Sequence, residues 1–461
     1  MYNALTSIYK CAKGRVRNSS ASLSQLFNCP QGLRQGCVLS PLLFSFFINE
    51  LALERESSCY SGVQLHPDVV QIFLLLFADD VVLFADTVYG LQKRINVLGD
   101  FCERHQLSVK LEKTKVVVFK NGNKLSKHEN WFLNGNRLQI VSSYKYLGVI
   151  LSRSLCWSAH VKSAVLQANK ILYSVFKSLH LLKPLPYDLF FKIFDTKICP
   201  IIFYGCEIWG LDNFKDIEIL QMFACKRFLG AKSATSNHVV RGECGRFPMY
   251  IFTYKRALSY WCKLCNMPNT RFVKKCYNLL LLDCINGKTN WTTKIKNILY
   301  LYGFGYIWEE QCVVHANDFL SAFVYRLKVA YEQDWHAALI NSSKYSSYIS
   351  FKSSFGLEPY IKEITICKFR TAFAQFRCFS HQLRIETGRY IKELKTYRLC
   401  VVCKERYVED EYHFVLVCNA YNKLRSQYLP QKYYNYPTVY KFNMLMSNVN
   451  PEILKICYVC V

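Results

Sequence analysis

Residues 71–85, QIFLLLFADDVVLFA, place two adjacent aspartates between two strongly apolar runs. The runs Ile72–Phe77 and Val81–Ala85 predict two strands, and Ala78-Asp79-Asp80 predicts the tight turn that joins them. The turn contains neither glycine nor an Asn-Gly pair, so ordinary hairpin chemistry does not specify it. Two neighbouring carboxylates between buried strands repel each other, and they are costly unless a cation or water neutralises them.

Carboxylate oxygens suit Mg²⁺, which keeps several waters and takes one or two protein carboxylates together with substrate phosphates. The pattern therefore favours a Mg²⁺ site at Asp79 and Asp80. The alternative is a solvated surface turn, which is the common setting of an Asp-Asp pair.

A glycine-containing turn precedes the aspartates, in the segment QGLRQGCVLSPLLFSFFINEL at residues 31–51. Gly32 and Gly36 permit tight backbone paths and close approach to a ligand. We interpret the segment as a loop that presents its backbone to a ligand, with Arg34 and Gln35 at its tip.

The residues after this loop predict a helix. Ser40 and Pro41 supply an N-cap hydroxyl followed by a proline at the first helical position. Leu43, Phe47 and Leu51 recur at helical spacing and predict its buried face. The alternative for the whole segment is an ordinary capped core helix without a ligand.

Together, GLRQGCVLSPLLF and FADD resemble the reverse transcriptases of retrotransposons without long terminal repeats. The resemblance continues in chain order and covers roughly residues 1–250. It includes Leu107–Lys115 (LSVKLEKTK), Tyr144–Ile150 (YKYLGVI), Tyr204–Gly210 (YGCEIWG) and Cys225–Gly230 (CKRFLG).

The resemblance implies RNA-directed DNA polymerase chemistry, in which two Mg²⁺ ions assist nucleotidyl transfer to a primer 3′ end. Asp79 would be a ligand of these ions and Asp80 a supporting carboxylate. Lys113 alone would be read as a solvated lysine on a strand edge, but the ordered motifs around it imply a position near the triphosphate. Template and incoming nucleotide would meet Arg34, Gln35, Gly36 and Ser40, and the primer end would meet Tyr146, Leu147 and Gly148.

Two departures from the family pattern affect the expected activity. Lys110 stands where the family usually has asparagine. The family also carries an aspartate that bridges both metals on a strand ahead of the glycine turn, whereas this chain has no acid before Glu50. We therefore expect an N-terminally truncated polymerase that lacks the fingers and has little or no activity alone. An upstream polymerase part or the full-length element protein is an expected partner.

A second candidate site is the segment CVVCKERYVEDEYHFVLVC at residues 400–418. Its C-x2-C-x9-H-x4-C spacing suits a tetrahedral structural Zn²⁺ site formed by Cys400, Cys403, His413 and Cys418. The alternative is an incidental grouping in a chain with 22 cysteines. The pairs Cys262/Cys265 and Cys457/Cys460 also have C-x2-C spacing. No His-Cys pair follows closely after either of them, so we treat them as incidental.

The Cys/His segment also resembles the zinc-binding region that follows the polymerase in the same retroelements. Its expected task there is to grip RNA or the target DNA.

The middle of the chain predicts helices. Val161, Val165, Ala168, Leu172 and Val175 recur at helical spacing and predict a buried stripe. Three lysines lie off that stripe and form a basic face: Lys162, Lys170 and Lys177. By its position in the chain, this helix matches the thumb of a polymerase. The alternative is that the lysine face is simply exposed to solvent.

The predicted fold is α+β: a partial polymerase palm, with an antiparallel sheet and helices, precedes helical thumb and connection regions and a small zinc-binding module. We divide the chain into five parts. They are a partial palm (1–150), a helical thumb-like region (151–270), a helical connection (271–395), a CCHC zinc-knuckle-like module (396–425) and a basic tail (426–461).

Charge supports a nucleic-acid partner. The chain has 59 Lys and Arg against 33 Asp and Glu, a formal net charge of +26. We expect an RNA template, a DNA primer or target, and deoxynucleoside triphosphates. The first residues lack a signal-peptide pattern, and no run of about 18 apolar residues could span a bilayer. We therefore expect an intracellular protein of the nucleus or cytoplasm, neither secreted nor membrane-bound.

The leading hypothesis is a reverse transcriptase domain protein of a retroelement. The alternative is a non-catalytic RNA- or DNA-binding remnant that keeps the basic surface and the zinc knuckle. A nuclease gains no support, because the stretch after Cys418 contains a single acid, Glu452.

Overall fold

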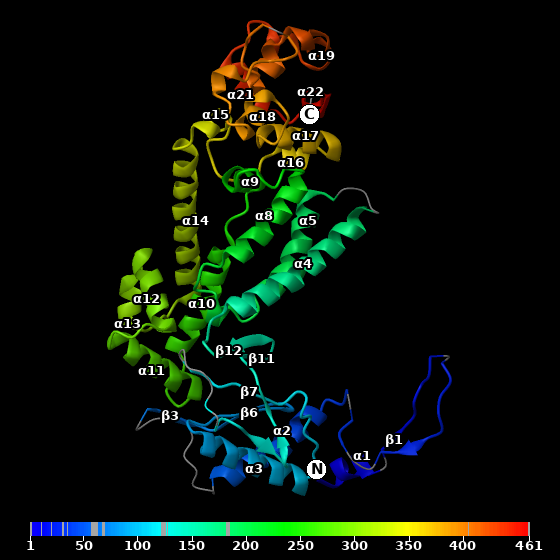
Figure 1. Ribbon diagram of the computed structural model, residues 1–461, viewed down its shortest axis with the longest axis vertical. Helices are drawn as coiled ribbons and strands as arrows, with labels where there is room; N and C mark the ends of the chain where they lie inside the picture. The colour runs from blue at the N-terminus through cyan, green and yellow to red at the C-terminus, as the bar shows by residue number, and fades with distance from the viewer. Residues whose placement is uncertain are drawn as a thin grey trace. The chain divides into compact units, whose positions relative to one another are not determined.

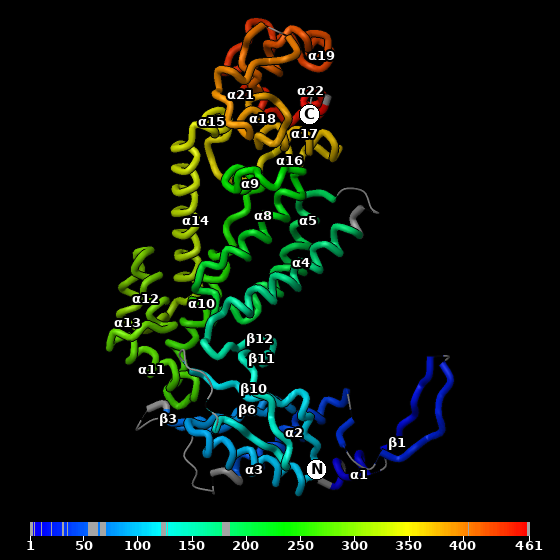
Figure 2. The backbone as a smooth tube through the Cα atoms, in the orientation of Figure 1, coloured from blue at the N-terminus to red at the C-terminus, as the bar shows by residue number. Residues whose placement is uncertain are grey.

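The computed structural model (Figures 1 and 2) forms two compact units, Met1–Ser142 and Ser143–Val461, which we describe separately. Gln35 and Cys460 lie outside the described residues. The described residues are 2–10, 12–19, 21–29, 32–34, 36–56, 63–66, 70–120, 126, 128–180, 185–403 and 405–459.

In its described residues, the N-terminal unit combines three helices with small two-stranded sheets. The helices are α1 (Tyr2–Lys10), α2 (Ser40–Glu56) and α3 (Val88–Arg104). The antiparallel pairs are β1 (Lys13–Gly14) with β2 (Phe27–Asn28), β3 (Val63–His66) with β4 (Val70–Ile72), β5 (Leu74–Phe77) with β6 (Asp80–Leu83), and β8 (Phe132–Leu133) with β9 (Asn136–Arg137). One pair is parallel, β7 (Lys115–Val116) with β10 (Gln139–Ile140).

The predicted aspartate hairpin is confirmed. Strands β5 and β6 pair antiparallel from Leu74↔Leu83 to Phe77↔Asp80, so the turn consists of Ala78 and Asp79. Ala78 has a φ of 51°, in the left-handed region that residues with a Cβ rarely adopt. Such a turn usually has glycine at this position, so the alanine here holds a strained backbone conformation.

Helix α2 begins at Ser40, as predicted. Its buried face is different from the prediction, because Ile48 and Leu51 are buried while Phe47 is 37% exposed. Phe44 packs partly against the same small core, which also includes Phe101 of α3. The helix carries apolar residues on several sides, so helical spacing alone does not select the face that meets the strands.

The C-terminal unit starts with a hairpin and continues almost entirely as helices. The hairpin is β11 (Ser143–Tyr146) with β12 (Val149–Ser152). The first group of helices is α4 (Ser158–His180), α5 (Tyr187–Ile193), α6 (Cys199–Ile202), α7 (Cys206–Trp209), α8 (Lys215–Leu229), α9 (Asn237–Cys244) and α10 (Met249–Cys265), with a π-helical turn at Phe194–Ile198.

The remaining helices extend to the end of the described chain. Helix α14 is one long helix between the α11–α13 group and α15 (Figure 1). The set is α11 (Phe272–Ile285), α12 (Trp291–Leu301), α13 (Gly305–Glu310), α14 (Ala316–Ile340), α15 (Ser346–Phe351), α16 (Tyr360–Glu363), α17 (Cys367–Arg377), α18 (Arg384–Tyr390), α19 (Asn422–Tyr428), α20 (Gln431–Tyr434), α21 (Val439–Met446) and α22 (Pro451–Val459), with a π-helical turn at His413–Val417 and short 3-10 turns at Ser343–Tyr345, Lys395–Tyr397 and Asn419–Tyr421.

Helix α4 confirms the predicted amphipathic pattern. Val161, Ala168 and Leu172 are at most 2% exposed, and Val165 packs partly against the same core. The three lysines of the opposite face, Lys162, Lys170 and Lys177, are exposed.

The main hydrophobic core of the C-terminal unit extends in sequence from Val161 to Cys457. It includes Phe414, Val415 and Leu416 from the Cys/His segment. A second core lies among α10 to α14 and contains Trp261 and Phe323. The Cys/His segment is therefore integrated with the helices, and the five-part division stays a prediction.

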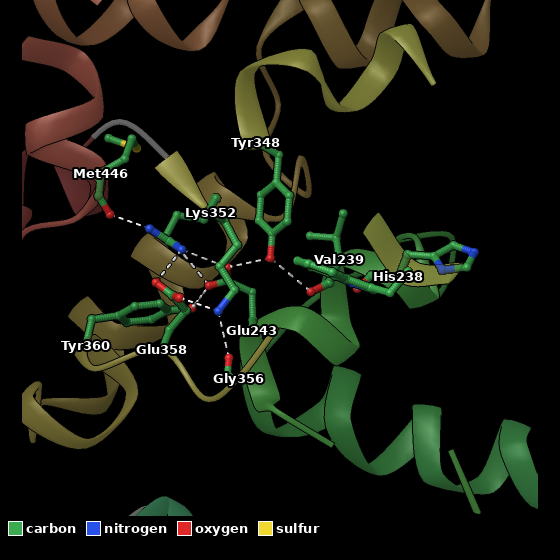
Figure 3. Close-up of polar contacts among 11 residues, drawn as sticks. His238, Val239, Glu243, Tyr348, Lys352, Gly356, Glu358, Tyr360 and Met446 are labelled. Carbon is green, nitrogen blue, oxygen red and sulfur yellow. Dashed lines mark hydrogen bonds and ion pairs between the residues drawn. The ribbon is translucent and has the colours of Figure 1, made fainter. Parts of the chain in front are cut away.

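A buried ionic cluster, which we call the Glu243 cluster, joins helices far apart in sequence (Figure 3). Glu243 of α9 accepts hydrogen bonds from Arg377 Nε at 2.9 Å and Nη2 at 2.8 Å. It also accepts from Tyr348 Oη at 2.9 Å and Tyr360 Oη at 2.7 Å. Burial opposes the ionisation of Glu243, but the guanidinium and these hydrogen bonds hold its pKa below the usual value.

Glu358 and Lys352 complete the Glu243 cluster. Arg377 Nη2 donates to Glu358 at 2.6 Å, and Lys352 Nζ donates to Glu358 at 2.5 Å and to the Gly356 carbonyl at 2.7 Å. Arg377 Nη1 also donates to the carbonyl of Met446. The buried Glu243 and the partly buried Glu358 are thus balanced by the buried cations Arg377 and Lys352, and the cluster links α9, α17 and α21.

The mixed, helix-rich structure with small antiparallel sheets agrees with the predicted α+β class. Among the described residues, no helix has the length and apolar character that a bilayer crossing requires. Every cysteine that the structure describes is free, and of these Cys156 and Cys312 alone are exposed.

Candidate functional site

The Asp79–Asp80 turn presents two exposed carboxylates at the end of an anchored hairpin. Asp79 lies in the turn and Asp80 begins β6. Leu74, Leu76 and Val81 pack against the core of α2 and α3, which fixes the strands below the turn. Adjacent carboxylates on such a support can hold a hydrated divalent cation. Both side chains are exposed, as they would also be in a solvated turn.

Lys113 is exposed in a turn that ends at β7. Its backbone N–H donates to the Lys110 carbonyl at 3.0 Å, and the Thr114 hydroxyl donates to the same carbonyl at 3.0 Å. Val116, two residues beyond Thr114, is buried. Lys110, which departs from the family pattern, therefore contributes its backbone to the turn that carries Lys113.

The glycine-containing loop is tied to helix α1. Ser40 Oγ donates to the Arg34 carbonyl at 2.8 Å and lies 3.0 Å from Tyr9 Oη. Arg34 Nη2 donates to the Ile8 carbonyl at 2.7 Å. Gly36 has a φ of 82°, as expected for a tight backbone path. The structure thus brings Arg34 and Ser40 together, and it adds Tyr9, which no sequence pattern indicated.

Cys37 also belongs to this loop. Hydrogen bonds from the backbone N–H of Leu39 and from the Tyr9 hydroxyl lower the pKa of its thiol.

The predicted primer-binding residues form a two-residue hairpin turn. Leu147 and Gly148, between paired Tyr146 and Val149, have φ values of 45° and 85°. Tyr204 Oη donates to the Leu147 carbonyl at 2.8 Å. A Cβ on Gly148 would lie 2.7 Å from the Tyr204 ring. Glycine therefore suits this position for two reasons: the Tyr204 ring lies close to it, and its φ is positive.

Tyr204 therefore joins two segments of the reverse transcriptase resemblance, YKYLGVI and YGCEIWG. Its own carbonyl accepts a hydrogen bond from Trp209 Nε1 at 3.0 Å, and Trp209 is buried. The sequence placed Tyr204 in a family segment but did not indicate that it supports the hairpin turn.

The Cys/His segment brings its four predicted ligands together. One ligand atom from each of Cys400, Cys403, His413 and Cys418 lies within 4.8 Å of all the others. Cys403 Sγ is 3.4 Å from His413 Nε2, and Cys400 Sγ is 4.0 Å from Cys418 Sγ. Three thiols and one imidazole form a donor set suited to tetrahedral Zn²⁺.

Local backbone structure creates this arrangement. The Cys400 N–H donates to the Tyr407 carbonyl at 2.8 Å, which closes the loop between the first two cysteines and the chain that follows. The π-helical turn His413–Val417 brings the Cys418 N–H within 2.7 Å of the His413 carbonyl. An extra residue in a helical turn is frequent at functional sites.

Burial disfavours the thiolate forms of Cys400 and Cys418 and the cationic form of His413. Burial raises the pKa of Cys400 and raises that of Cys418 to about 12. Burial also lowers the pKa of His413, whose Nδ1 is buried without a hydrogen-bond partner. Thiols in such surroundings become thiolates when a bound cation replaces their protons.

The other C-x-x-C pairs have different surroundings. Cys262 and Cys265 lie on α10, where Cys262 belongs to the second core and Cys265 Sγ lies 3.8 Å from Tyr277 Oη. Cys457 is buried in the main core. Within the described part of the chain, Cys400, Cys403, His413 and Cys418 are the one grouping with metal-ligand geometry.

Comparison with known proteins assigns the N-terminal part of the chain. Residues 4–151 match the family model described as reverse transcriptase (RNA-dependent DNA polymerase). The chain is also similar to the RNA-directed DNA polymerase from the mobile element jockey of Drosophila melanogaster, with 26% identity over 212 residues. It is 27% identical over 216 residues to the probable RNA-directed DNA polymerase from transposon BS of the same species.

A third relative is the probable RNA-directed DNA polymerase from transposon X-element of Drosophila melanogaster, with 24% identity over 240 residues. These matches cover 43–50% of this chain and 22–25% of the relatives. The chain therefore spans about a quarter of the length of the curated relatives that it matches. The matched region contains both the glycine-containing loop and the aspartate hairpin. Residues 4–151 are thus similar to reverse transcriptase domains, and these relatives are RNA-directed DNA polymerases of mobile elements.

Proposed function

We propose that this chain contributes to RNA-directed DNA synthesis by a retroelement, adding nucleotides to a primer 3′ end. The observation that carries the proposal is the Asp79–Asp80 turn, held at the tip of an anchored hairpin inside the matched reverse transcriptase region. In this proposal, residues 1–150 act as a partial palm and residues 151–270 as a thumb-like region, with a connection at 271–395 and a basic tail at 426–461.

Asp79 and Asp80 are proposed to hold divalent cations. When bound, such ions would activate the primer hydroxyl and stabilise the leaving pyrophosphate. Lys113 would stabilise charge on the triphosphate. The exposed position of all three side chains leaves them accessible to a nucleotide.

The glycine-containing loop is proposed to contact template and incoming nucleotide through Arg34, Gln35, Gly36 and Ser40. The contact of Arg34 with the Ile8 carbonyl is exposed, so a phosphate or base could compete for the guanidinium. The hairpin turn of Tyr146, Leu147 and Gly148 is proposed to hold the primer end, with Tyr204 as its support.

We further propose that the 461-residue polypeptide alone extends primers poorly. Residues 1–49 contain no Asp or Glu, so within this polypeptide no acid precedes Glu50 that could bridge two metals. Loss of one bridging ligand misplaces the reacting groups, and a displacement of about 1 Å can cost about 10²-fold in rate. An upstream polymerase part would be the natural partner.

Primer extension on an RNA template with Mg²⁺ tests this proposal. The 461-residue protein should extend no more than its Asp79→Ala variant. Robust extension that Asp79→Ala abolishes would refute the proposed inactivity while confirming the role of Asp79. Stable binding of the primer–template by both proteins is expected in either case.

Residues 396–425 are proposed to form a structural zinc module. The protein should purify with about one zinc per chain, measured by atomic emission, and Cys403→Ser should lose the metal. Cys262→Ser is the matched control, because its thiol lies in a helical core pair rather than in the cluster. Full retention of zinc by Cys403→Ser would contradict the assignment.

The second candidate function is non-catalytic binding of RNA or DNA, favoured by the net charge of +26. Under this second candidate, RNA affinity depends on the Cys/His segment and not on Asp79. A binding remnant keeps its RNA affinity in Asp79→Ala and loses affinity in Cys403→Ser. We also propose an intracellular location, where cysteines stay reduced, because every described cysteine is free.

A further inference from the structure

His160 is a buried histidine that contacts the hairpin of β11 and β12. It lies in the first turn of α4 and is 4% exposed. Its Nδ1 accepts a hydrogen bond from the backbone N–H of Ile150 in β12 at 3.3 Å. Its Nε2 is buried and finds no hydrogen-bond partner among the described residues. The ring is thus shielded from water, and one of its nitrogens binds the hairpin backbone.

The Ile150 N–H needs a partner outside the hairpin. Tyr146 and Val149 close a two-residue hairpin, whose strand pairs alternate between pairs that exchange hydrogen bonds and pairs that do not. Ile150 lies opposite Lys145 in a pair of the second kind, so its N–H points away from β11. A backbone N–H withdrawn from water without a partner is costly, and His160 supplies that partner.

The surroundings of His160 favour the neutral imidazole that this hydrogen bond requires. Burial lowers the pKa of His160, and the Lys145 ammonium lowers it too, which together outweigh the opposite effect of the Tyr204 carbonyl. A neutral ring with its proton on Nε2 leaves Nδ1 free to accept. An imidazolium carries protons on both nitrogens and could not accept the Ile150 N–H.

The segment around Tyr204 anchors the same hairpin at its turn. Tyr204 Oη donates to the Leu147 carbonyl at 2.8 Å. A Cβ on Gly205 would lie 3.1 Å from Cγ2 of Val149, so the chain after Tyr204 packs closely on β12. The hairpin is therefore held from two separate segments of the C-terminal unit.

Trp209 connects these two anchors. Its Nε1 donates to the Tyr204 carbonyl at 3.0 Å, and its ring meets the His160 ring edge-on, with centroids 5.5 Å apart and planes at 66°. Trp209 is itself buried. His160 and Tyr204 thus share one buried support, and they bind the hairpin backbone at Ile150 and Leu147.

We propose that His160 is a positioning residue for the primer 3′ end. It acts through the hairpin, because its hold on the Ile150 N–H fixes the orientation of the turn. The inference rests on the proposed function, in which Tyr146, Leu147 and Gly148 hold the primer. The buried imidazole itself does not touch the primer.

Two substitutions separate the hydrogen bond from the packing of the ring. In His160→Asn, the side-chain oxygen takes the place of Nδ1 and can still accept from the Ile150 N–H. In His160→Gln, the polar group lies one carbon farther from the backbone, in the place of Nε2, and this acceptor is lost. Val161→Ala is the matched control, because it removes buried volume at the adjacent position of α4 and leaves the Ile150 hydrogen bond in place.

Photocrosslinking with the 461-residue protein tests the inference. The probe is an RNA template annealed to a DNA primer with a 3′-terminal thiothymidine, and mass spectrometry identifies the crosslinked peptide. The unsubstituted protein should crosslink within residues 144–150. His160→Gln should reduce this crosslink about fivefold or more, as expected for loss of one hydrogen bond. His160→Asn and Val161→Ala should keep it.

Two further measurements separate positioning from binding and from folding. Primer–template affinity, measured by fluorescence anisotropy, should change less than about twofold in His160→Gln, because the buried ring makes no contact with nucleic acid. Without nucleic acid, peptides covering residues 147–152 should exchange their amide hydrogens faster in His160→Gln than in His160→Asn. Circular dichroism melting curves establish that each variant is folded at the assay temperature.

The outcomes distinguish this inference from the proposed function. A crosslink that His160→Gln leaves unchanged would overturn the inference alone. Equal losses in His160→Asn and His160→Gln would also overturn it, because the effect would not depend on the acceptor. Absence of a crosslink within residues 144–150 of the unsubstituted protein would refute the proposed primer site and, with it, the role assigned to His160.

Discussion

Removal of Arg377 from the Glu243 cluster should destabilise the C-terminal unit strongly. Arg377→Met keeps most of the side-chain volume but removes the charge and its donors. Glu243 then loses two charge-assisted hydrogen bonds, of 2.8 and 2.9 Å, and Glu358 loses one of 2.6 Å. Lys352 still neutralises Glu358, so Glu243 is the carboxylate left buried without a cation.

The magnitude follows from this partial compensation. Breaking a buried pair by removing one partner typically costs about 3–5 kcal/mol. The hydroxyls of Tyr348 and Tyr360 still donate to Glu243, which favours the lower half of that range. We therefore expect the free energy of unfolding to fall by about 3–4 kcal/mol.

Equilibrium unfolding in urea, followed by tryptophan fluorescence, measures the change. Trp335 is a suitable reporter because it is buried and its Nε1 donates to the His238 carbonyl at 2.8 Å, on the helix that carries Glu243. Lys455→Ala is the matched control, because its ion pair with the exposed Glu452 should contribute less than about 1 kcal/mol. A loss below about 1 kcal/mol in Arg377→Met would refute the reasoning.

Three further results are expected. Ala78→Gly should raise thermal stability by about 1 kcal/mol, because glycine adopts the observed φ of 51° without strain, and calorimetry showing destabilisation would contradict this. Gly148→Ala should lower the free energy of unfolding in urea by about 1–3 kcal/mol, because the new Cβ would clash with the Tyr204 ring. Tyr204→Phe should lower it by about 1 kcal/mol, because one hydrogen bond is lost. Chelation of zinc should lower the melting temperature of the protein by several degrees, because Phe414, next to the predicted ligand His413, packs in the main core. An unchanged melting curve would show that the Cys/His segment does not stabilise that core.

Local patterns in the sequence predicted the local structure well. The apolar runs around Asp79 and Asp80, the Ser40-Pro41 start of α2 and the stripe of α4 each depend on residues a few positions apart. The Cys/His spacing likewise predicted four ligands that the chain brings together. In each case the element is short enough for its own residues to determine it.

Features that depend on distant residues could not be predicted. Glu243 and Arg377 are 134 positions apart, and neither has a local pattern that marks it as buried. Tyr204 supports a turn 57 positions earlier, through a contact that exists only in the folded chain. The prediction of the buried face of α2 was wrong in part for a related reason. Packing against β5, β6 and α3 buries Ile48 and leaves Phe47 exposed.

The central claim is that Asp79 and Asp80 form the divalent-metal site of a reverse transcriptase domain. Iron-directed cleavage tests it without requiring polymerase activity. Fe²⁺ replaces Mg²⁺ in the presence of primer–template and nucleotide. Added hydrogen peroxide is reduced by the bound Fe²⁺ to hydroxyl radicals that cut the backbone nearby, and ascorbate regenerates Fe²⁺. We predict cleavage close to residues 77–82 that disappears in Asp79→Asn and Asp80→Asn and persists in Asp86→Asn, a nearby exposed acid. Absence of cleavage at this turn, or cleavage that survives both substitutions, would contradict the claim.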